Sequence, residues 1–345
     1  MVSEKRTFDL SILTSHRQEL YGVATLWIIT FHSYLCNVYF PTVIGNLITY
    51  GNMGCEVFLF LSGICLYFSY RGNEQYAPFI KRRLIRLYVP IMLICVWYWL
   101  YLLIKSGVSL GSFGTLVANF LTLSLWITGD SQIWFVSLLL VVYLLYPLVY
   151  RFMFCGKHTN IAAVLLLVLS VGLALLLKAV APGFYSRTEV ALTRLPVFLI
   201  GCWFGQAVYT RKLFPRWVII PCAVTFCGVI GVLNADVLHG ICRRYFYLFG
   251  GIALTFVLAW LFNRIAWHPL HAVFSFFGNM SLELYLWNII LIRLYRATPF
   301  YDTQHPSAVE YLLLLVLNIL LAYISYRISK CVTSSVQRRL LKRNL

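Results

Sequence analysis

Charged side chains are scarce in this chain, and acidic ones are the scarcest. Only 11% of its 345 residues are charged against 61% that are hydrophobic, and 28 lysines and arginines face 11 aspartates and glutamates. A soluble protein of this length cannot hide so much apolar surface from water. The composition therefore excludes a soluble globular fold and predicts a polytopic membrane protein.

Patterns typical of several other protein classes are also absent. None of the ten cysteines forms a CxxC or another metal-binding spacing, and most lie within apolar runs, which favours small core residues. The histidine pair in HPLH, residues 268–271, has no further ligand at a suitable spacing, so we expect no metal site. No signal-peptide pattern or internal repeat occurs, and we expect one integral membrane domain over 1–345 with short tails at 1–19 and 329–345.

Long apolar runs are what the sequence has in abundance. A helix needs about 20 apolar residues to cross a bilayer. Runs of this length predict an all-α bundle of about ten transmembrane helices around a polar cavity, at 20–40, 52–70, 88–105, 133–151, 160–179, 190–209, 215–234, 244–262, 274–292 and 309–328. The apolar stretch 113–127 is too short to span easily and is interpreted as an interfacial or re-entrant piece.

Positive charge lies mainly between these runs and alternates along the chain. With a cytoplasmic N-terminus, twenty of the 28 lysines and arginines fall in cytoplasmic segments, in agreement with the positive-inside rule. The pattern predicts that both termini are cytoplasmic, in a multi-pass protein of the cell membrane, with a bacterial cytoplasmic membrane as the expected location. Because membrane orientation and lipid contact account for the net charge of +17, we expect no nucleic-acid partner.

Two ionisable residues interrupt the first two apolar runs. His32 lies within 20–40 and Glu56 within 52–70, and such groups are costly in hydrocarbon and mark function by default. On the predicted topology they could meet in the outer half of the membrane, where the carboxylate would fix the tautomer of the imidazole. A general base that takes a proton from a hydroxyl needs this arrangement. A structural His–Glu pair that joins two helices is the alternative.

Six segments together resemble acyltransferase family 3, a family of integral membrane proteins. ELYGVATLWIITFHS is similar to the family's first helix with its histidine, and GCEVFLFLSGICLYFSY to its acidic residue followed by FFxLSG. The other four are, in the family's order, FIKRRLIRLYVP, QIWFVSLLLVVYLLYPLVY, RLPVFLIGCWFG and FGNMSLELYLWNI. Single apolar motifs recur by chance, but six in order across residues 19–289 are specific.

The resemblance implies transfer of an acyl group, usually acetyl from acetyl-CoA, to a hydroxyl of a cell-surface polysaccharide or lipid-linked sugar. It implies that His32 is the catalytic base and Glu56 its orienting partner. It also favours donor binding by the cytoplasmic arginines, because guanidinium groups bind phosphate bidentately, although the positive-inside rule alone would place arginines there. These donor-binding candidates are Arg82, Arg83 and Arg86, and the candidates for contacts to the acceptor or the intermediate are Arg194, Trp134 and Tyr285.

Two positions depart from the family pattern. The family usually has Arg or Lys eleven positions before the histidine, where this chain has Tyr21. Arg17 lies one helical turn earlier, on the same face, and is predicted to contact coenzyme A in its place. The late pattern of the family ends in histidine, where this chain has Asn288, so we expect no second imidazole.

Two other functions fit the same residues. A transporter or flippase of a lipid-linked glycan or acyl group would also use a buried histidine and glutamate. Such carriers more often have paired halves with interrupted helices, which the sequence does not display. The other alternative is acylation of a non-glycan envelope acceptor, such as a protein, peptide or antibiotic hydroxyl. Whether His32 is a general base or carries the acyl group covalently stays open, as does the donor chain length.

Overall fold

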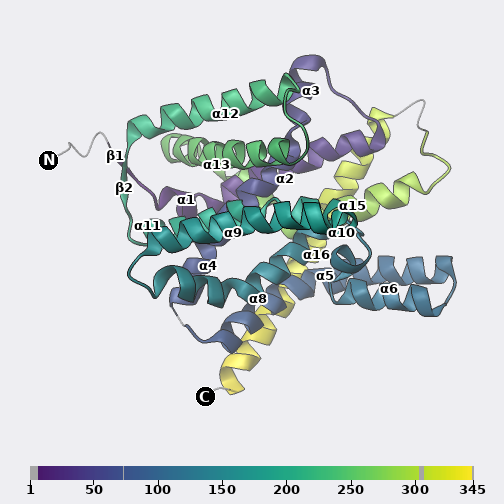
Figure 1. The fold of residues 1–345 in the computed structure, drawn as a ribbon. Coiled ribbons are helices and arrows are strands. Elements are labelled where there is room, and N and C mark those ends of the chain that lie inside the picture. Colours follow the sequence, from purple (N-terminus) through teal and green to yellow (C-terminus); the bar gives the residue numbers. More distant parts are fainter. Residues whose placement is uncertain (1–6, 73, 303–306, 344–345) are drawn as a thin grey trace. The chain divides into compact units, whose positions relative to one another are not determined.

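The computed structural model describes residues 7–72, 74–302 and 307–343, and most of these residues are helical (Figure 1). Among these described residues, eight helical segments are long and apolar enough to cross a membrane, which confirms the expected helical, multi-pass class. They are Ile44–Arg71, Tyr76–Ser106, Trp134–Phe154, Thr159–Val180, Pro182–Tyr209, Arg216–Asn234, Gly240–Arg264 and Ala308–Val336. The stretch 113–127 forms two short helices, α6 (Leu110–Phe120) and α7 (Ser124–Ile127), as its length predicts.

The first predicted span, 20–40, is interrupted. It consists of α2 (Arg17–Phe31) and a 3-10 helix, η2 (His32–Cys36). The helical path then ends at Asn37, whose φ of 58° lies in the left-handed region that asparagine tolerates better than most residues. His32 is therefore the first residue after the α-helix and not a residue inside a continuous span.

The ninth predicted span, 274–292, is also divided. It belongs to α14 (His268–Asn279) and α15 (Ser281–Arg296), which are separated by Met280 with φ −111° and ψ 24°. Apolar composition alone does not reveal such a break, so the sequence predicts 20–40 and 274–292 as continuous spans. About ten spans and two cytoplasmic termini stay predictions.

The chain forms two compact units, each built from separated stretches. The first unit comprises the described residues of Met1–Phe31, Phe40–Glu74 and Tyr146–Asn279, and the second comprises those of His32–Tyr39, Gln75–Leu145 and Met280–Leu345. The chain passes from one unit to the other at both helix interruptions, between Phe31 and His32 and between Asn279 and Met280.

The first unit contains most of the helices. Two strands of three residues each form a short antiparallel ribbon in which Phe8 pairs with Phe214. The elements of this unit are β1 (Thr7–Asp9), α1 (Ile12–Ser15), α2, α3 (Thr42–Ile48), η3 (Gly51–Met53), α4 (Gly54–Arg71), α9 (Thr159–Val180), α10 (Pro182–Leu192), α11 (Leu195–Tyr209), β2 (Leu213–Pro215), η4 (Arg216–Val218), α12 (Ile219–Asn234), α13 (Gly240–Arg264), α14 and the last part of α8 (Trp134–Phe154).

Glycines allow two helix pairs of this unit to approach closely. A Cβ at Gly63 of α4 would lie 2.4 Å from the carbonyl oxygen of Phe198 in α11. In α2, a Cβ at Gly22 would lie 2.0 Å from the carbonyl oxygen of Phe274 in α14. Small residues bring helix backbones together in this way in membrane proteins. The backbones of the α4–α11 and α2–α14 pairs are therefore held close together, which fixes the positions of the side chains on these helices.

The second unit is a smaller helical assembly in which α15 is central. Helix α15 packs against α5 (Tyr76–Ser106) and α16 (Ala308–Arg343), and it also contacts η2, which begins with His32. Helices α6, α7 and the first part of α8 complete this unit.

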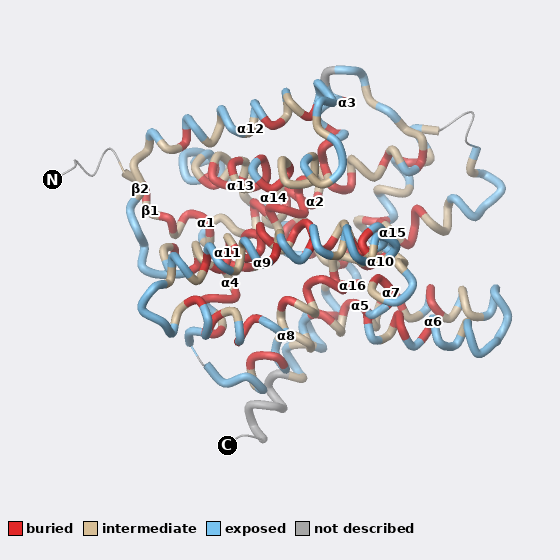
Figure 2. Tube along the Cα trace, viewed as in Figure 1, coloured by how far each residue is buried: buried red, intermediate tan, exposed pale blue. Residues whose placement is uncertain are grey.

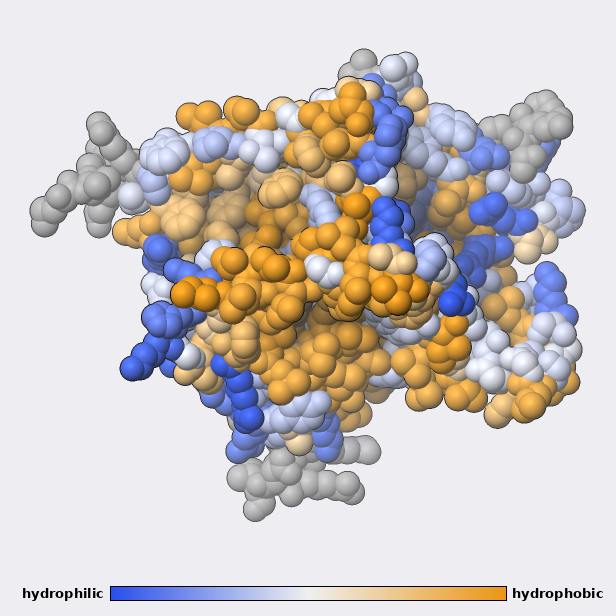
Figure 3. Space-filling view, viewed as in Figure 1, coloured by the Kyte–Doolittle hydropathy of each residue, from blue (hydrophilic) through white to orange (hydrophobic). Residues whose placement is uncertain are grey.

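Apolar side chains remain on the surface of several helices. Leu165, Leu169 and Leu176 of α9 are exposed, and Figure 3 shows orange apolar side chains over this helix. Figure 2 shows exposed turns along α12 as well, whereas α4 is mainly buried. In water this surface would be unfavourable, but a bilayer solvates it, which agrees with a membrane protein.

Candidate active site

A buried ion pair joins two of the predicted site residues in the first unit. Glu56 lies in the first turn of α4 and Arg194 directly precedes α11. The Nε atom of Arg194 lies 2.9 Å from Oε1 of Glu56, and the two side chains are 3% and 2% exposed. Arg194 also donates a hydrogen bond to the carbonyl oxygen of Val190 over 2.9 Å. The ion pair therefore joins α4 to α11, two helices whose backbones already pack closely.

The second carboxylate oxygen of Glu56 has no hydrogen-bond partner among the described residues. Buried polar atoms are nearly always paired, so an unpaired one calls for an explanation. Sequence reasoning selected Glu56 and Arg194 separately and did not predict that they bind each other, because no local pattern relates α4 to α11.

His32 lies in the second unit, and its ring contacts Asn288 of α15. The Nδ1 atom lies 2.6 Å from Oδ1 of Asn288, whose side chain is buried. A carboxamide oxygen only accepts hydrogen bonds, so this contact assigns the proton to Nδ1 and the lone pair to Nε2. Asn288 therefore makes the contact to the ring that was expected of a carboxylate. The sequence identifies Asn288 as a departure from the family's histidine but does not predict this contact.

His32 and Glu56 thus have different partners in different units. The predicted orienting contact from Glu56 to His32 stays a prediction.

The three cytoplasmic arginines differ in their surroundings. Helix α5 begins at Tyr76, so Arg82 and Arg86 lie one turn apart on the same helix face, and both are exposed. The guanidinium carbon of Arg83 instead lies 5.7 Å from the ring centre of Phe79 and 5.8 Å from that of Tyr143. Cation–π contacts of this kind favour a packing role for Arg83 and leave Arg82 and Arg86 as the better donor-binding candidates.

Arg17 begins α2 and reaches across to α4. Its Nη1 atom lies 3.4 Å from Sγ of Cys65. The ring of Tyr21, one turn later, stacks on Phe58 with the ring centres 4.7 Å apart. The two positions therefore have different neighbours, and a donor-binding role for Arg17 stays a prediction.

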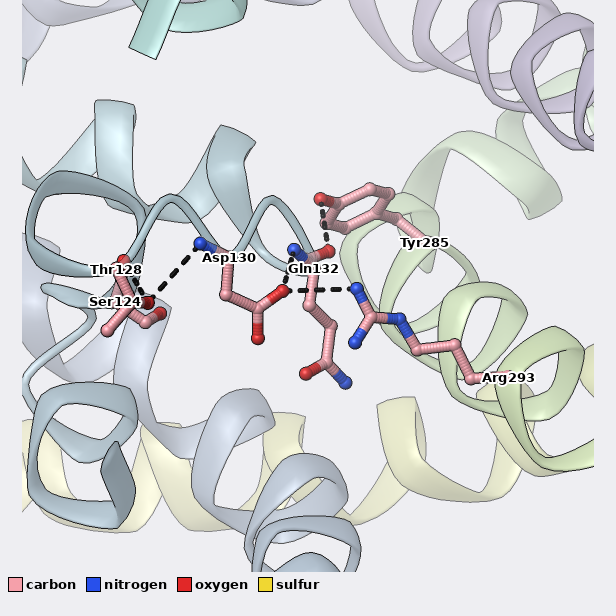
Figure 4. Close-up of polar contacts among 6 residues, drawn as sticks. All are labelled: Ser124, Thr128, Asp130, Gln132, Tyr285 and Arg293. Atoms are coloured by element: carbon pink, nitrogen blue, oxygen red, sulfur yellow. Dashed lines mark hydrogen bonds and ion pairs between the residues drawn. The ribbon is translucent and has the colours of Figure 1, made fainter. Parts of the chain in front are cut away.

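A polar cluster in the second unit includes another predicted residue, Tyr285 (Figure 4). Its hydroxyl donates a hydrogen bond to the backbone carbonyl oxygen of Gln132 over 3.1 Å. The backbone N–H of Gln132 in turn donates to Oδ1 of Asp130 over 3.0 Å, and Nη2 of Arg293 lies 3.1 Å from the same carboxylate oxygen. Helix α15 carries both Tyr285 and Arg293, so it fixes the loop that precedes α8.

The side chain of Gln132 is the unusual member of this cluster. It is 3% exposed, yet neither its oxygen nor its nitrogen has a hydrogen-bond partner among the described residues. Figure 4 shows its carboxamide on the opposite side of the backbone from Tyr285. A buried amide without partners is costly, and a bound ligand with hydroxyl groups would satisfy it.

Sequence reasoning missed Asp130, Gln132 and Arg293. It did select Trp134, which begins α8 two residues after Gln132. The GDSQ stretch before the apolar run of α8 was the available signal, because acidic residues are so scarce in this chain.

Comparison with known proteins agrees with the resemblance drawn from the sequence. A family model described as an acyltransferase domain matches residues 21–327, which is most of the chain. The protein is therefore a membrane acyltransferase by class, and the chain belongs to acyltransferase family 3. No curated protein matches it, and no solved structure matches it.

Proposed function

We propose that this protein transfers an acyl group, acetyl in the first instance, from cytoplasmic acyl-CoA to a hydroxyl of a cell-surface polysaccharide or lipid-linked sugar. Family membership supports the acyl-transfer chemistry. The single observation that carries the mechanism is the contact from Nδ1 of His32 to Oδ1 of Asn288, because it leaves Nε2 as a proton acceptor.

The proposed step uses His32 as a general base. Nε2 takes the proton of the acceptor hydroxyl while its oxygen attacks the thioester carbonyl carbon. The C–S bond then breaks, and the leaving thiolate of coenzyme A receives the proton from His32. The products are the acyl ester and free coenzyme A, and the imidazole returns to its starting state. Asn288 holds the ring in one tautomer throughout.

The donor candidates Arg82 and Arg86 and the acceptor candidate Gln132 lie in the same unit as His32. The exposed arginines Arg82 and Arg86 of α5 suit the phosphates of coenzyme A. Gln132 suits the hydroxyls of a sugar, since its buried carboxamide can both donate and accept. Helix α15 connects these roles, because it carries Asn288, Tyr285 and Arg293.

A transport function has one observation in its favour. Interrupted helices, which the sequence did not display, occur at the end of α2 and between α14 and α15. Broken helices line substrate sites in many transporters. They are also compatible with an enzyme whose substrates enter from opposite sides, and family membership favours the enzyme.

Mass analysis of surface glycans from cells with and without the protein tests the proposal. We expect glycans from producing cells to carry the additional mass of one acetyl group per modified sugar, and His32→Ala to remove it at normal protein abundance. A transporter would change the amount of glycan exported without changing its acylation, and that result would contradict the proposal.

The acceptor site is tested with Gln132→Leu. Leucine fills much of the same volume without needing hydrogen-bond partners, so the protein should stay folded while the KM for the acceptor rises and the KM for acyl-CoA stays the same. Gln206→Leu is the matched control, because Gln206 is an exposed glutamine of α11. An acceptor KM equal to that of the control would exclude Gln132 from the acceptor site.

A further inference from the structure

Three side chains that lie apart in the chain bring one ligand atom each to a common point in the first unit. His16 follows α1, Glu19 lies in the first turn of α2, and His271 lies in the first turn of α14. One nitrogen or carboxylate oxygen from each lies within 4.8 Å of the other two. The HPLH segment alone predicts no metal site, because only the fold brings His16 and Glu19 beside His271.

We propose that His16, Glu19 and His271 bind a divalent transition metal ion of the zinc class and that this ion fastens the α1–α2 junction to α14. This site is independent of the acyl-transfer chemistry proposed above. Two imidazoles and one carboxylate are a ligand set that zinc accepts, with a fourth position left for water.

The distances between the ligand atoms suit such an ion. Oε1 of Glu19 lies 3.0 Å from Nδ1 of His271 and 3.6 Å from Nδ1 of His16. A tetrahedral ion at about 2.0–2.1 Å from its ligands holds them about 3.3 Å from one another. Small movements of the side chains would therefore complete the geometry.

The contacts of His271 leave its Nδ1 atom facing the Glu19 carboxylate at the centre of the cluster. Its Nε2 lies 2.8 Å from the backbone carbonyl oxygen of Ile265, which only accepts, so Nε2 carries a hydrogen. In the neutral ring, Nδ1 then directs its lone pair at the Glu19 carboxylate 3.0 Å away. Two acceptors at this distance need a cation between them, which is either a proton or a metal ion. A hydrogen bond from the other ring nitrogen to a backbone carbonyl is also the usual support of a metal-bound histidine.

His16 supplies a second, independent indication. Its Nδ1 atom is buried and has no hydrogen-bond partner among the described residues. The ring of Phe262 lies against both imidazoles, with ring centres 6.4 Å from that of His16 and 5.4 Å from that of His271. An unpaired imidazole nitrogen beside a buried carboxylate, shielded by an aromatic ring, is well placed to bind a metal.

The backbones that carry these ligands are held firmly. Besides the contact at Gly22, a Cβ at Gly278 of α14 would lie 1.8 Å from the carbonyl oxygen of Gln18 in α2. Ligands on packed helices keep their geometry better than ligands on loops. A bound metal ion would add a further link between α2 and α14, whose backbones already pack closely.

A proton is the competing occupant. The hydrogen bond to Glu19 raises the pKa of His271, so the cluster can also exist as an imidazolium–carboxylate pair. Metal binding would displace that proton, and the affinity should therefore fall as the pH falls.

The test uses Co²⁺ as a spectroscopic probe on the full chain, purified in detergent without a polyhistidine tag and stripped with a chelator. We expect one equivalent of Co²⁺ to bind with visible d–d absorption and no thiolate charge-transfer band, which separates this site from the ten cysteines. Zn²⁺ should displace the signal and raise the melting temperature of the stripped protein. A wild-type protein without stoichiometric cobalt absorption, or with equal melting temperatures after stripping and after zinc addition, would overturn the proposal.

Variants locate the site. His16→Ala, Glu19→Gln and His271→Ala should each weaken Co²⁺ binding more than about 100-fold, since even supporting residues around metals cost about 10–100-fold. His268→Ala is the matched control, because His268 is exposed on the same helix. Cobalt binding that survives in all three variants would show that the metal binds elsewhere and would exclude this cluster.

Discussion

At the scale of single residues, the proposed acyl transfer depends on the contact between His32 and Asn288. We predict that His32→Ala lowers the acyl-transfer rate by about 100- to 10,000-fold, the usual contribution of a general base. Insertion and abundance should stay near normal, because His32 directly follows α2 and its side chain is only half-buried.

Asn288 should act through His32 and not on the substrate. Asn288→Ala removes the acceptor for Nδ1–H, so we expect kcat to fall by about 10- to 100-fold, as for other misplaced catalytic groups, with little change in the KM for acyl-CoA. Asn288→Asp keeps an acceptor oxygen at the same place and should retain more activity than Asn288→Ala. Equal kcat values for wild type and Asn288→Ala would mean that Asn288 does not position the base.

The arginines of α5 allow a third prediction at this scale. Arg82→Gln and Arg86→Gln should weaken acyl-CoA binding without changing the unfolding temperature, since both side chains are exposed. Lysine should restore binding only in part, because it keeps the charge but loses the planar fork. Binding of acyl-CoA measured by calorimetry and thermal unfolding separates the two effects.

Arg83 provides the internal comparison. Its guanidinium lies over the rings of Phe79 and Tyr143, so Arg83→Gln should lower the unfolding temperature more than it weakens donor binding. A loss of donor binding that is the same at all three positions, with unchanged stability, would contradict this division.

At the scale of elements, the closeness of α4 and α11 carries the buried Glu56–Arg194 pair. A Cβ at Gly63 would meet the Phe198 carbonyl oxygen at 2.4 Å, and a backbone atom cannot turn aside as a flexible side chain can. We predict that Gly63→Ala destabilises the protein by about 1–3 kcal/mol, the usual cost of overpacking. Thermal unfolding in detergent measures it.

Gly172→Ala is the control for this prediction. Gly172 lies in α9, and a Cβ there would meet no atom within 4 Å. The change should be neutral or slightly stabilising, since alanine favours helices. Equal destabilisation by both variants would point to a general intolerance of helix substitutions and not to the α4–α11 contact.

The elements also separate what could be predicted from the sequence from what could not. The lengths of the apolar runs predicted the uninterrupted spans well, because a helix that is long and apolar enough to cross a bilayer can be recognised from composition. The breaks at His32 and Met280 were not predicted, since each depends on local backbone conformation and on contacts with distant helices. For the same reason His32 and Glu56 were selected as costly polar residues and Arg194 from the family resemblance, whereas the contacts that these residues make were not predicted. Gln132 was not predicted, because its unpaired carboxamide is unusual only when it is buried, and its burial depends on the surrounding fold.

At the scale of the whole molecule, the helices of the first unit have two ends. Basic residues at the same end must lie on the same side of the membrane. Trp203 of α11 bonds Asn160 at the start of α9 over 3.1 Å, so the loop with Lys157 and the turn at Arg211 lie at one end. The β1–β2 ribbon joins the N-terminal segment to this end, because β2 directly follows Arg211 and Lys212.

The opposite end is defined by a second ion pair. Arg244 at the start of α13 lies 3.1 Å from Glu189 of α10, so Arg243 and Arg187 share that end. Lys157, Arg211 and β1 are thus on one side of the first unit and Arg187 and Arg243 on the other. The charge pattern predicts the same division of these four basic residues.

Two native cysteines allow the sidedness of these ends to be measured. Cys155 is exposed beside Lys157, and Cys242 is exposed beside Arg243. We predict that a membrane-impermeant maleimide applied to intact cells labels a variant that keeps Cys242 as its only cysteine and spares one that keeps only Cys155. Cells that are opened before labelling supply the control, since both variants should then react. Reversed labelling in intact cells would place Lys157, Arg211 and β1 outside, and the positive-inside assignment would be wrong. Arg82 and Arg86 would then need their own measurement, because that assignment is the basis for placing them with cytoplasmic coenzyme A.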